Sequence, residues 1–175
     1  MKIPVIKSKE FLLRPFRSGD EESLQKNINN KNIAKVISTI PHPYTLKNAK
    51  DWIDRNLKIA KEKNPKEDNF VIEKNSEVAG SISLTKIEIG HKAEMGYWLA
   101  EKYWGAGIMT KAAKLAAEFG FKEFRLKRIY ASVYSFNKGS QKVLEKSGFK
   151  LEGILRKHHK KDGKLIDLCV FGKIK

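Results

Sequence analysis

The chain has 175 residues, of which 32% are charged and 41% hydrophobic, and its formal net charge at pH 7 is +16. This length favours one domain with a proper core, over residues 1–175, and the longest apolar runs are far too short to span a membrane. The N-terminus also lacks the hydrophobic region of a signal peptide, so we expect a cytoplasmic protein that does not bind membranes.

The basic charge invites a nucleic-acid interpretation, but its distribution argues against sequence-specific binding. Lysine outnumbers arginine by 30 to 6 and is spread along every segment, whereas phosphate and base recognition relies heavily on the arginine fork. We therefore expect a solvated lysine surface, with at most weak association with ribosomes or RNA.

The first part of the chain predicts one strand followed by two helices. The strand covers residues 11–16, and Asp20 is placed to cap a helix that Asn29-Asn30 interrupts. Thr45 is placed to cap the second helix, which has an apolar inner stripe. Three further strands follow at 70–74, 78–87 and 93–99, and their short polar links predict an antiparallel meander.

The segment Tyr103 to Thr110 reads Tyr-Trp-Gly-Ala-Gly-Ile-Met-Thr and lies between a strand and a long amphipathic helix. Glycines at a helix start let an anion approach unpaired backbone N–H groups, so the turn is a candidate phosphate cradle. From the spacing alone, a simple strand-to-helix connection is an equally good interpretation. A Walker loop is excluded because Thr110 precedes Lys111, and a dinucleotide fingerprint lacks its third glycine.

The last part of the chain predicts a strand at 128–134, a short helix, and two strands at 149–155 and 165–174. Asn137 is placed to cap the helix, Gly148 to end it, and Asp162-Gly163 lies in a polar hairpin link. The single cysteine, Cys169, has no disulfide partner and is expected to be a small core residue.

Several motifs, in this order and at this spacing, resemble the GNAT superfamily of N-acetyltransferases, and within it the RimJ/RimL group of protein N-terminal acetyltransferases. The resemblance extends over nearly the whole chain. The motifs that carry it are Leu13-Arg14-Pro15-Phe16, Pro43-Tyr44-Thr45, Glu94-x-Gly96-Tyr97-Trp98-Leu99, Tyr103-Trp104-Gly105-x-Gly107 with Thr110, Asn137-x-x-Ser140, Leu144-Glu145-Lys146-x-Gly148-Phe149 and Asp162-Gly163-Lys164.

The resemblance implies an α/β fold with a mixed, mostly antiparallel sheet of six to seven strands, a central splay and about four flanking helices. It implies acetyl-CoA as cosubstrate, with the pyrophosphate on the backbone N–H groups of the glycine turn and the Leu99 N–H on the thioester carbonyl. The residues expected to bind the cofactor are Trp98, Leu99, Trp104, Gly105, Ala106, Gly107, Ile108, Met109, Thr110, Asn137 and Ser140.

Attack of an amine on a thioester needs a proton acceptor, an oxyanion donor and an acid for the thiolate. Many GNAT members have a tyrosine seven residues after the asparagine as that acid, but Leu144 stands there. The RimJ/RimL arrangement indicates Ser140 instead, with Asn137 beside it; both are also ordinary helix-start residues. Glu94 is the candidate base, although an exposed carboxylate paired with a lysine is an equally good interpretation.

The most favoured acceptor is the N-terminal α-amine of a protein or peptide, because such an amine needs no strong base. The alternatives are a small-molecule amine (a polyamine, amino acid or antibiotic) or a non-catalytic CoA- or RNA-binding module. Acceptor choice depends on the loop at 38–44 and the hairpin at 157–164. His158 and His159 are neighbours on a strand-like run, so we expect no metal site. A monomer and a homodimer both fit.

Overall fold

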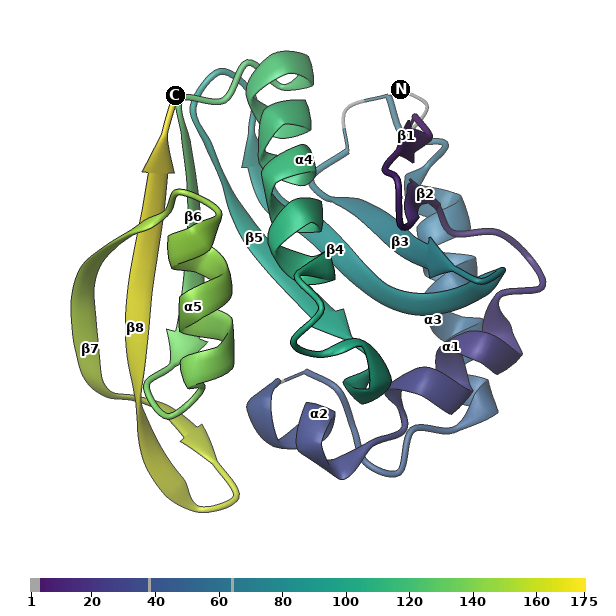
Figure 1. Ribbon diagram of the computed structural model, residues 1–175, viewed down its shortest axis with the longest axis horizontal. Coiled ribbons are helices and arrows are strands. Elements are labelled where there is room, and N and C mark those ends of the chain that lie inside the picture. Colours follow the sequence, from purple (N-terminus) through teal and green to yellow (C-terminus); the bar gives the residue numbers. More distant parts are fainter. Residues whose placement is uncertain (1–3, 38, 64) are drawn as a thin grey trace.

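The computed structural model describes residues 4–37, 39–63 and 65–175. An eight-stranded sheet in the order β1-β2-β3-β4-β5-β6-β8-β7 runs through these residues, with helices on both faces (Figure 1). The strands are β1 (Ile6–Lys7), β2 (Leu12–Pro15), β3 (Asp68–Lys74), β4 (Glu77–Glu88), β5 (Lys92–Leu99), β6 (Arg128–Tyr134), β7 (Lys150–Lys161) and β8 (Lys164–Ile174). The helices are α1 (Glu21–Ile28), α2 (Lys31–Val36), α3 (Leu46–Ile59), α4 (Ile108–Glu123) and α5 (Lys138–Lys146), with a 3₁₀ turn η1 (Glu101–Tyr103).

The expected fold class is confirmed, and two short elements account for most of the difference in counts. β1 pairs with β2 but is only two residues long, which is too short to show an alternation of apolar and polar residues in the sequence. α2 has six residues, too few for a clear helical period. The Asn30 side chain accepts hydrogen bonds from the N–H groups of Asn32 and Ile33, so the asparagine pair that ends α1 also caps a new helix.

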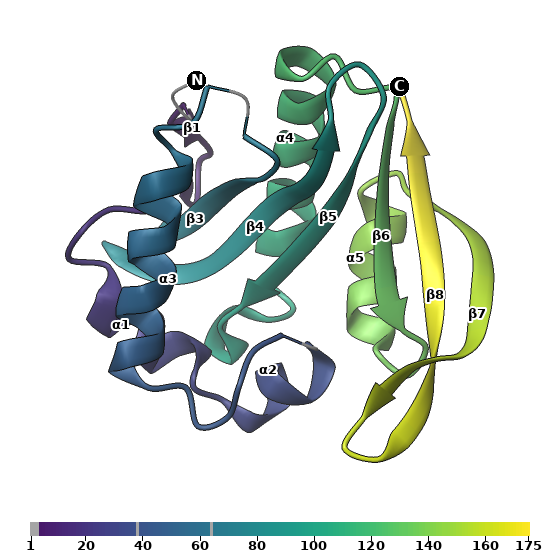
Figure 2. The same cartoon turned by 180° about the vertical axis from the view of Figure 1, so that it is seen from behind.

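The sheet has an apolar core on each face. α4 covers one face with four fully buried alanines, Ala112, Ala113, Ala116 and Ala117. Gly120 brings this helix still closer, since an added Cβ would lie 2.7 Å from Leu84 Cδ1. Figure 2 shows α1 and α3 on the opposite face, where Trp98 belongs to the second core. The free Cys169 is buried, as expected.

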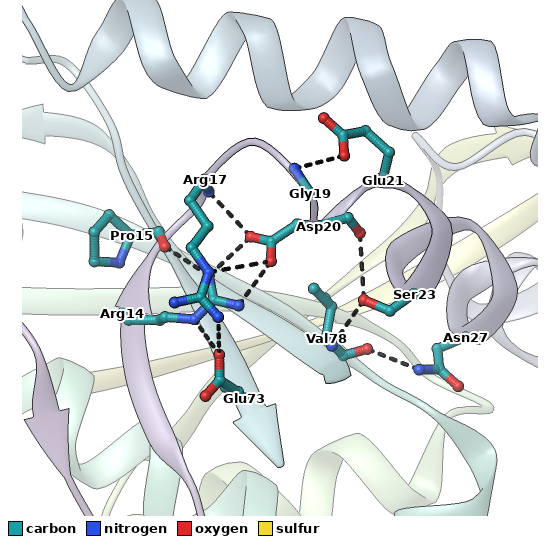
Figure 3. Close-up of polar contacts among 10 residues, drawn as sticks. All are labelled: Arg14, Pro15, Arg17, Gly19, Asp20, Glu21, Ser23, Asn27, Glu73 and Val78. Atoms are coloured by element: carbon teal, nitrogen blue, oxygen red, sulfur yellow. Dashed lines mark hydrogen bonds and ion pairs between the residues drawn. The ribbon is translucent and has the colours of Figure 1, made fainter. Parts of the chain in front are cut away.

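A buried charge cluster fixes the start of α1 to the sheet (Figure 3). The guanidinium of Arg14 donates to both carboxylate oxygens of Asp20, at 2.7 and 2.8 Å, and its Nε donates to Glu73 at 2.5 Å. Asp20 therefore does not cap α1 with its side chain. The helix is also held to β4 by Ser23 and Asn27, which bond the N–H and C=O of Val78.

The sheet opens between β5 and β6, which are parallel neighbours. They pair only over Lys92–Glu94 and Arg128–Tyr130. Beyond this point β5 stays with β4 and β6 stays with β8, so a gap widens toward their carboxyl ends (Figure 1, Figure 2). The expected splay is therefore present.

β7 is longer than expected. The strand predicted to end at Leu155 continues through a register shift to Lys161, and a two-residue turn at Asp162 and Gly163 with φ of 49° and 76° joins it to β8. The Lys161 ammonium donates to the carbonyl oxygens of Ala34 and Ile37 at 2.5 and 2.6 Å. The β7–β8 hairpin is thus tied to the end of α2, across the mouth of the splay.

No helix in the part of the chain that the structure describes is long and apolar enough to cross a membrane.

Candidate active site

The loop after β5 has the conformation that its glycines predict. Gly105 and Gly107 have φ of +78° and +75°, in the left-handed region that favours glycine. A Cβ added at either position would have no neighbouring atom within 4 Å. The backbone therefore faces open space, where an anion can approach it.

The start of α4 supplies unpaired donors at this loop. Helices α2, α3 and α5 each begin with a side-chain cap, but α4 begins at Gly107 without one. The N–H groups of Ile108, Met109 and Thr110 have no intrahelical acceptors, and they carry the positive end of the helix dipole. The backbone N–H of Trp104 is not a free donor, because it donates to Glu101 O at 3.0 Å, and the indole Nε1 donates to Leu99 O at 2.7 Å. A role of Trp104 in cofactor binding stays a prediction.

Three lysines on α5 complete a cationic flank that sequence reasoning missed. Lys138, Lys142 and Lys146 recur every four residues, so they share one face of α5, and all three line the cavity that the loop borders. Ser147 Oγ donates to Thr110 O at 3.2 Å and holds the end of α5 against the start of α4. The donor set suits a diphosphate. The four-residue spacing of the lysines, next to a candidate phosphate loop, is the sequence signal that could have revealed this flank.

One large cavity, of about 1420 Å³, joins this loop to the opposite face of the sheet through the splay. All the predicted catalytic and cofactor-binding residues line it except Ala106, including Glu94, Trp98, Leu99, Asn137 and Ser140. On the α3 face it is lined by Trp52, Asn69, Tyr130 and Tyr134 among others. Its size exceeds that of an ordinary small-molecule pocket and suits two substrates together.

The Leu99 amide lies at the edge of the gap. The N–H of Ala100 donates to Ala79 O on β4 at 2.8 Å. Because successive amides of a strand point in opposite directions, the N–H of Leu99 is directed away from β4, toward β6. This orientation suits a donor for a carbonyl group lying in the splay.

Ser140 and Asn137 lie on the other side of the gap, at the start of α5. Asn137 Oδ1 accepts the Ser140 N–H at 3.1 Å, so Asn137 is the helix cap. The Ser140 hydroxyl lies 2.7 Å from the hydroxyl of Tyr97, which also donates to the Ser140 carbonyl oxygen at 3.2 Å. Burial raises the pKa of Tyr97 to about 12. The sequence indicates Tyr97 only as one residue of a family motif, whereas the fold places its hydroxyl group against that of Ser140.

A family model described as an acetyltransferase (GNAT) domain matches residues 10–150. The chain belongs to the GNAT acetyltransferase family. The probable N-acetyltransferase YjcK of Bacillus subtilis (strain 168) is 32% identical over 164 residues, with 91% of each chain covered. The spermidine N(1)-acetyltransferase of Escherichia coli (strain K12) is 28% identical, with 91% of this chain and 84% of that protein covered.

The structural comparison agrees with the family. The ribosomal-protein-S5-alanine acetyltransferase from Vibrio fischeri superimposes with a TM-score of 0.87 at 24% identity, over 98% of this chain and 97% of that one. The family model and the acetyltransferase relatives identify this GNAT protein as an acetyl-CoA-dependent N-acetyltransferase. Its open loop, uncapped helix start and α5 lysines fit the phosphates of the cosubstrate.

Glu94 is poorly placed as a direct base for a GNAT reaction. It lies at the closed end of the splay, in register with Tyr130, and its carboxylate binds Lys86 Nζ at 2.7 Å. Leu99 lies five positions further along β5, which corresponds to about 16 Å along the backbone. Proton transfer from an amine near Leu99 to Glu94 therefore requires a chain of waters.

The cavity of this GNAT protein is also lined by a group of aromatic residues that the sequence did not indicate. The Tyr134 ring lies 5.3 Å from the rings of both Phe136 and His159, measured between centroids. His158 also lines the cavity. Of the loop predicted at 38–44, Thr39 lines the cavity, whereas Ser38 lies outside the described residues. The described ranges contain no group of three His, Cys, Asp or Glu residues able to hold a metal ion.

Proposed function

We propose that the acceptor is the N-terminal α-amine of a protein or peptide. The observation that carries this proposal is the pairing of the acidic residues around the cavity. Only two carboxylates of the described residues line it, and each has a basic partner: Glu94 pairs with Lys86, and Glu67 with Arg55. A polyamine needs unpaired carboxylates to replace its water and counterions, and this cavity offers none.

The proton balance of the reaction favours the same acceptor. An α-amine with a pKa near 8 is about one-tenth neutral at pH 7, whereas an amine with a pKa above 10 is less than about a thousandth neutral. A site whose two cavity carboxylates, among the described residues, are both paired with basic side chains can use the first kind of amine and deprotonates the second kind poorly.

In this proposal each part of the site has one task. Acetyl-CoA supplies the activated acetyl group. The N–H groups from Gly105 to Thr110 hold its pyrophosphate, with the Thr110 hydroxyl as a further donor, and the α5 lysines offset its charge. The Leu99 N–H donates to the thioester oxygen as negative charge develops there, and the Ser140 hydroxyl is directed at the departing sulfur. Asn137 holds the α5 start that positions Ser140, and Glu94 acts only through water.

A small-molecule amine is the second candidate. It is supported by the spermidine N(1)-acetyltransferase of E. coli, which is similar over most of both chains. A paired carboxylate such as Glu94 would have to exchange Lys86 for an ammonium group of the substrate.

A thiol-release assay separates the candidates. The enzyme is incubated with acetyl-CoA and, in turn, a peptide with a free N-terminus, the same peptide blocked at its N-terminus but carrying an internal lysine, spermidine and an aminoglycoside. We expect turnover of the free peptide only, rising with pH through about 8 as the acceptor deprotonates. Acetylation of spermidine without any peptide would establish the second candidate, and CoA binding without turnover of any amine would indicate a binding module.

A further inference from the structure

Two segments border the acceptor end of the cavity, and together we call them the acceptor mouth: α2 (Lys31–Val36) and the β7–β8 hairpin at residues 156–164. Figure 1 and Figure 2 both show them on either side of the open end of the splay, and Lys161 joins them. Lys35 on one side and His158 and His159 on the other line the cavity itself.

The acceptor mouth is strongly basic. Its hairpin carries five basic residues and one acidic residue, Asp162, while α2 carries two lysines and no carboxylate. All of these cations are exposed except the half-buried Lys161. Within the described residues none of them takes part in an ion pair. The seven mouth cations are Lys31, Lys35, Arg156, Lys157, Lys160, Lys161 and Lys164.

The nearest acidic groups do not cancel this charge with ion pairs. Glu101 accepts hydrogen bonds from the side-chain amides of Asn30 and Asn32 beside α2, at 2.6 and 2.9 Å. Asp167 accepts the backbone N–H of Lys157 at 2.7 Å. Both carboxylates keep their negative charge, but together with Asp162 they offset only three of the seven mouth cations, so the mouth keeps a net positive charge.

We propose that the acceptor mouth selects a peptide whose N-terminal residue is followed by acidic residues. This inference rests on the proposed function. A chain that places its α-amine beside Leu99 must lead its next residues out of the cavity, between α2 and the hairpin, at about 3.3 Å per residue. Residues two to five of the acceptor then lie within about one Debye length, roughly 8 Å at physiological ionic strength, of the mouth cations.

A cationic rim concentrates anionic partners and repels polycations. RNA is also anionic, but the cations surround the entrance to a cavity in which an amine reacts, and the aromatic and histidine side chains continue inward from them. The arrangement therefore favours an acidic peptide, and it disfavours spermidine for a reason independent of the paired carboxylates.

The test compares three peptides that share an N-terminal alanine and differ only at residues two to four, which are all aspartate, all serine or all lysine. We expect kcat/KM to be about tenfold higher for the acidic peptide than for the neutral one at low salt, and lowest for the basic one. The advantage should shrink as salt rises from about 0.02 to 0.5 M, because mobile ions screen exposed charges.

Two charge-matched variants locate the effect. Lys160→Glu with Lys164→Glu changes the mouth, and Lys122→Glu with Lys127→Glu makes the same change in net charge at the other end of β6. The mouth variant should lose the preference for the acidic peptide and keep its turnover of the neutral peptide, whereas the control variant should keep both.

Each outcome of this comparison has a defined meaning. Equal kcat/KM for the acidic and neutral peptides in the unmodified enzyme would overturn the inference and leave the proposed function standing. The same loss in both variants would also overturn it, because the overall charge rather than the mouth would then be responsible. Turnover of none of the peptides, with turnover of spermidine, would overturn the proposed function itself. Competition by single-stranded RNA without any peptide-charge preference would assign the mouth to RNA.

Discussion

The hydroxyl groups of Tyr97 and Ser140 meet across the splay at 2.7 Å, and either one can donate to the other. When the Tyr97 hydroxyl donates to Ser140 O, at 3.2 Å, the Ser140 proton points at the Tyr97 oxygen. For Ser140 to donate to a thiolate, its proton must turn toward the sulfur, and Tyr97 can then donate to the serine oxygen. Tyr97 is thus a positioning residue for Ser140.

We expect Ser140→Ala to lower kcat by about 10²-fold and Tyr97→Phe by about tenfold, with the KM for acetyl-CoA little changed, because the groups act on the leaving thiolate. The double variant should be no slower than Ser140→Ala alone, since Tyr97 acts through the serine. Steady-state kinetics measure all three. Tyr44→Phe is the matched control, because among the described residues the Tyr44 hydroxyl bonds only Asn48 O, and Tyr44 does not line the cavity. Additive losses would show that Tyr97 acts independently.

The second prediction at this scale concerns the phosphate loop. A valine at Gly107 would fill the open space above the loop and would strain a backbone with φ of +75° by about 1–2 kcal/mol. We expect Gly107→Val to abolish measurable CoA binding in calorimetry. Gly19→Val is the control, because Gly19 also has a positive φ, of +96°, and open surroundings but does not line the cavity. Unchanged CoA affinity in folded Gly107→Val would remove the phosphate-site assignment.

Among the elements, α1 depends most on a buried charge. Arg14 and Asp20 are each 4% exposed, and their paired hydrogen bonds replace the water that both groups lose. Removing one partner leaves the other buried without full compensation, which is far more costly than losing an exposed ion pair.

We therefore expect Asp20→Ala to lower the free energy of unfolding by about 3–5 kcal/mol. Asp51→Ala, which removes the exposed pair between Lys47 and Asp51 on α3, should produce no measurable change. Urea denaturation of the two variants beside the unmodified protein makes the comparison. Equal small losses in both would mean that α1 is held mainly by its apolar face.

For the molecule as a whole, one buried carboxyl group links folding stability to pH. Asp68 begins β3, is 2% exposed, and its Oδ1 has no hydrogen-bond partner among the described residues. Burial raises the pKa of Asp68 from its ordinary 3.8 to about 7, an effect partly offset by the Asn69 N–H. Since the folded state holds this proton more tightly, the stabilising contribution is complete below about pH 4. It is lost as the pH rises through about 7.

We expect Asp68→Asn, which carries no titratable proton, to melt at a higher temperature than the unmodified protein at pH 8.5. The two melting temperatures should lie closer together at pH 5.5. Three pKa units correspond to at most roughly 4 kcal/mol, so the difference should be readily visible in thermal melts. Parallel pH dependence of the two proteins would show that Asp68 keeps its ordinary pKa.

Cytoplasmic location, weak association with ribosomes and the choice between monomer and homodimer stay predictions from the sequence.

Helix caps, turns and strands could be predicted from the sequence because the interactions that form them lie within a few residues of one another. Thr45 and Asn48 form a capping box, Asn137 caps α5, and the two glycines adopt positive φ where the helix start needs open backbone. Period-two alternation likewise located most strands.

Only the tertiary structure decided which of these elements meet. Tyr97 and Ser140 are 43 residues apart, and Lys161 and Ala34 are 127 apart, so neither contact leaves a signal in local composition. The length of the β5–β6 pairing places Glu94 at the closed end of the splay, because strand register and the point of divergence depend on packing from both faces of the sheet. The sequence by itself therefore determined most of the elements, the conformation of the glycine turn and the family, whereas the partner of Ser140, the distance of Glu94 from Leu99 and the basic acceptor mouth arose from long-range packing.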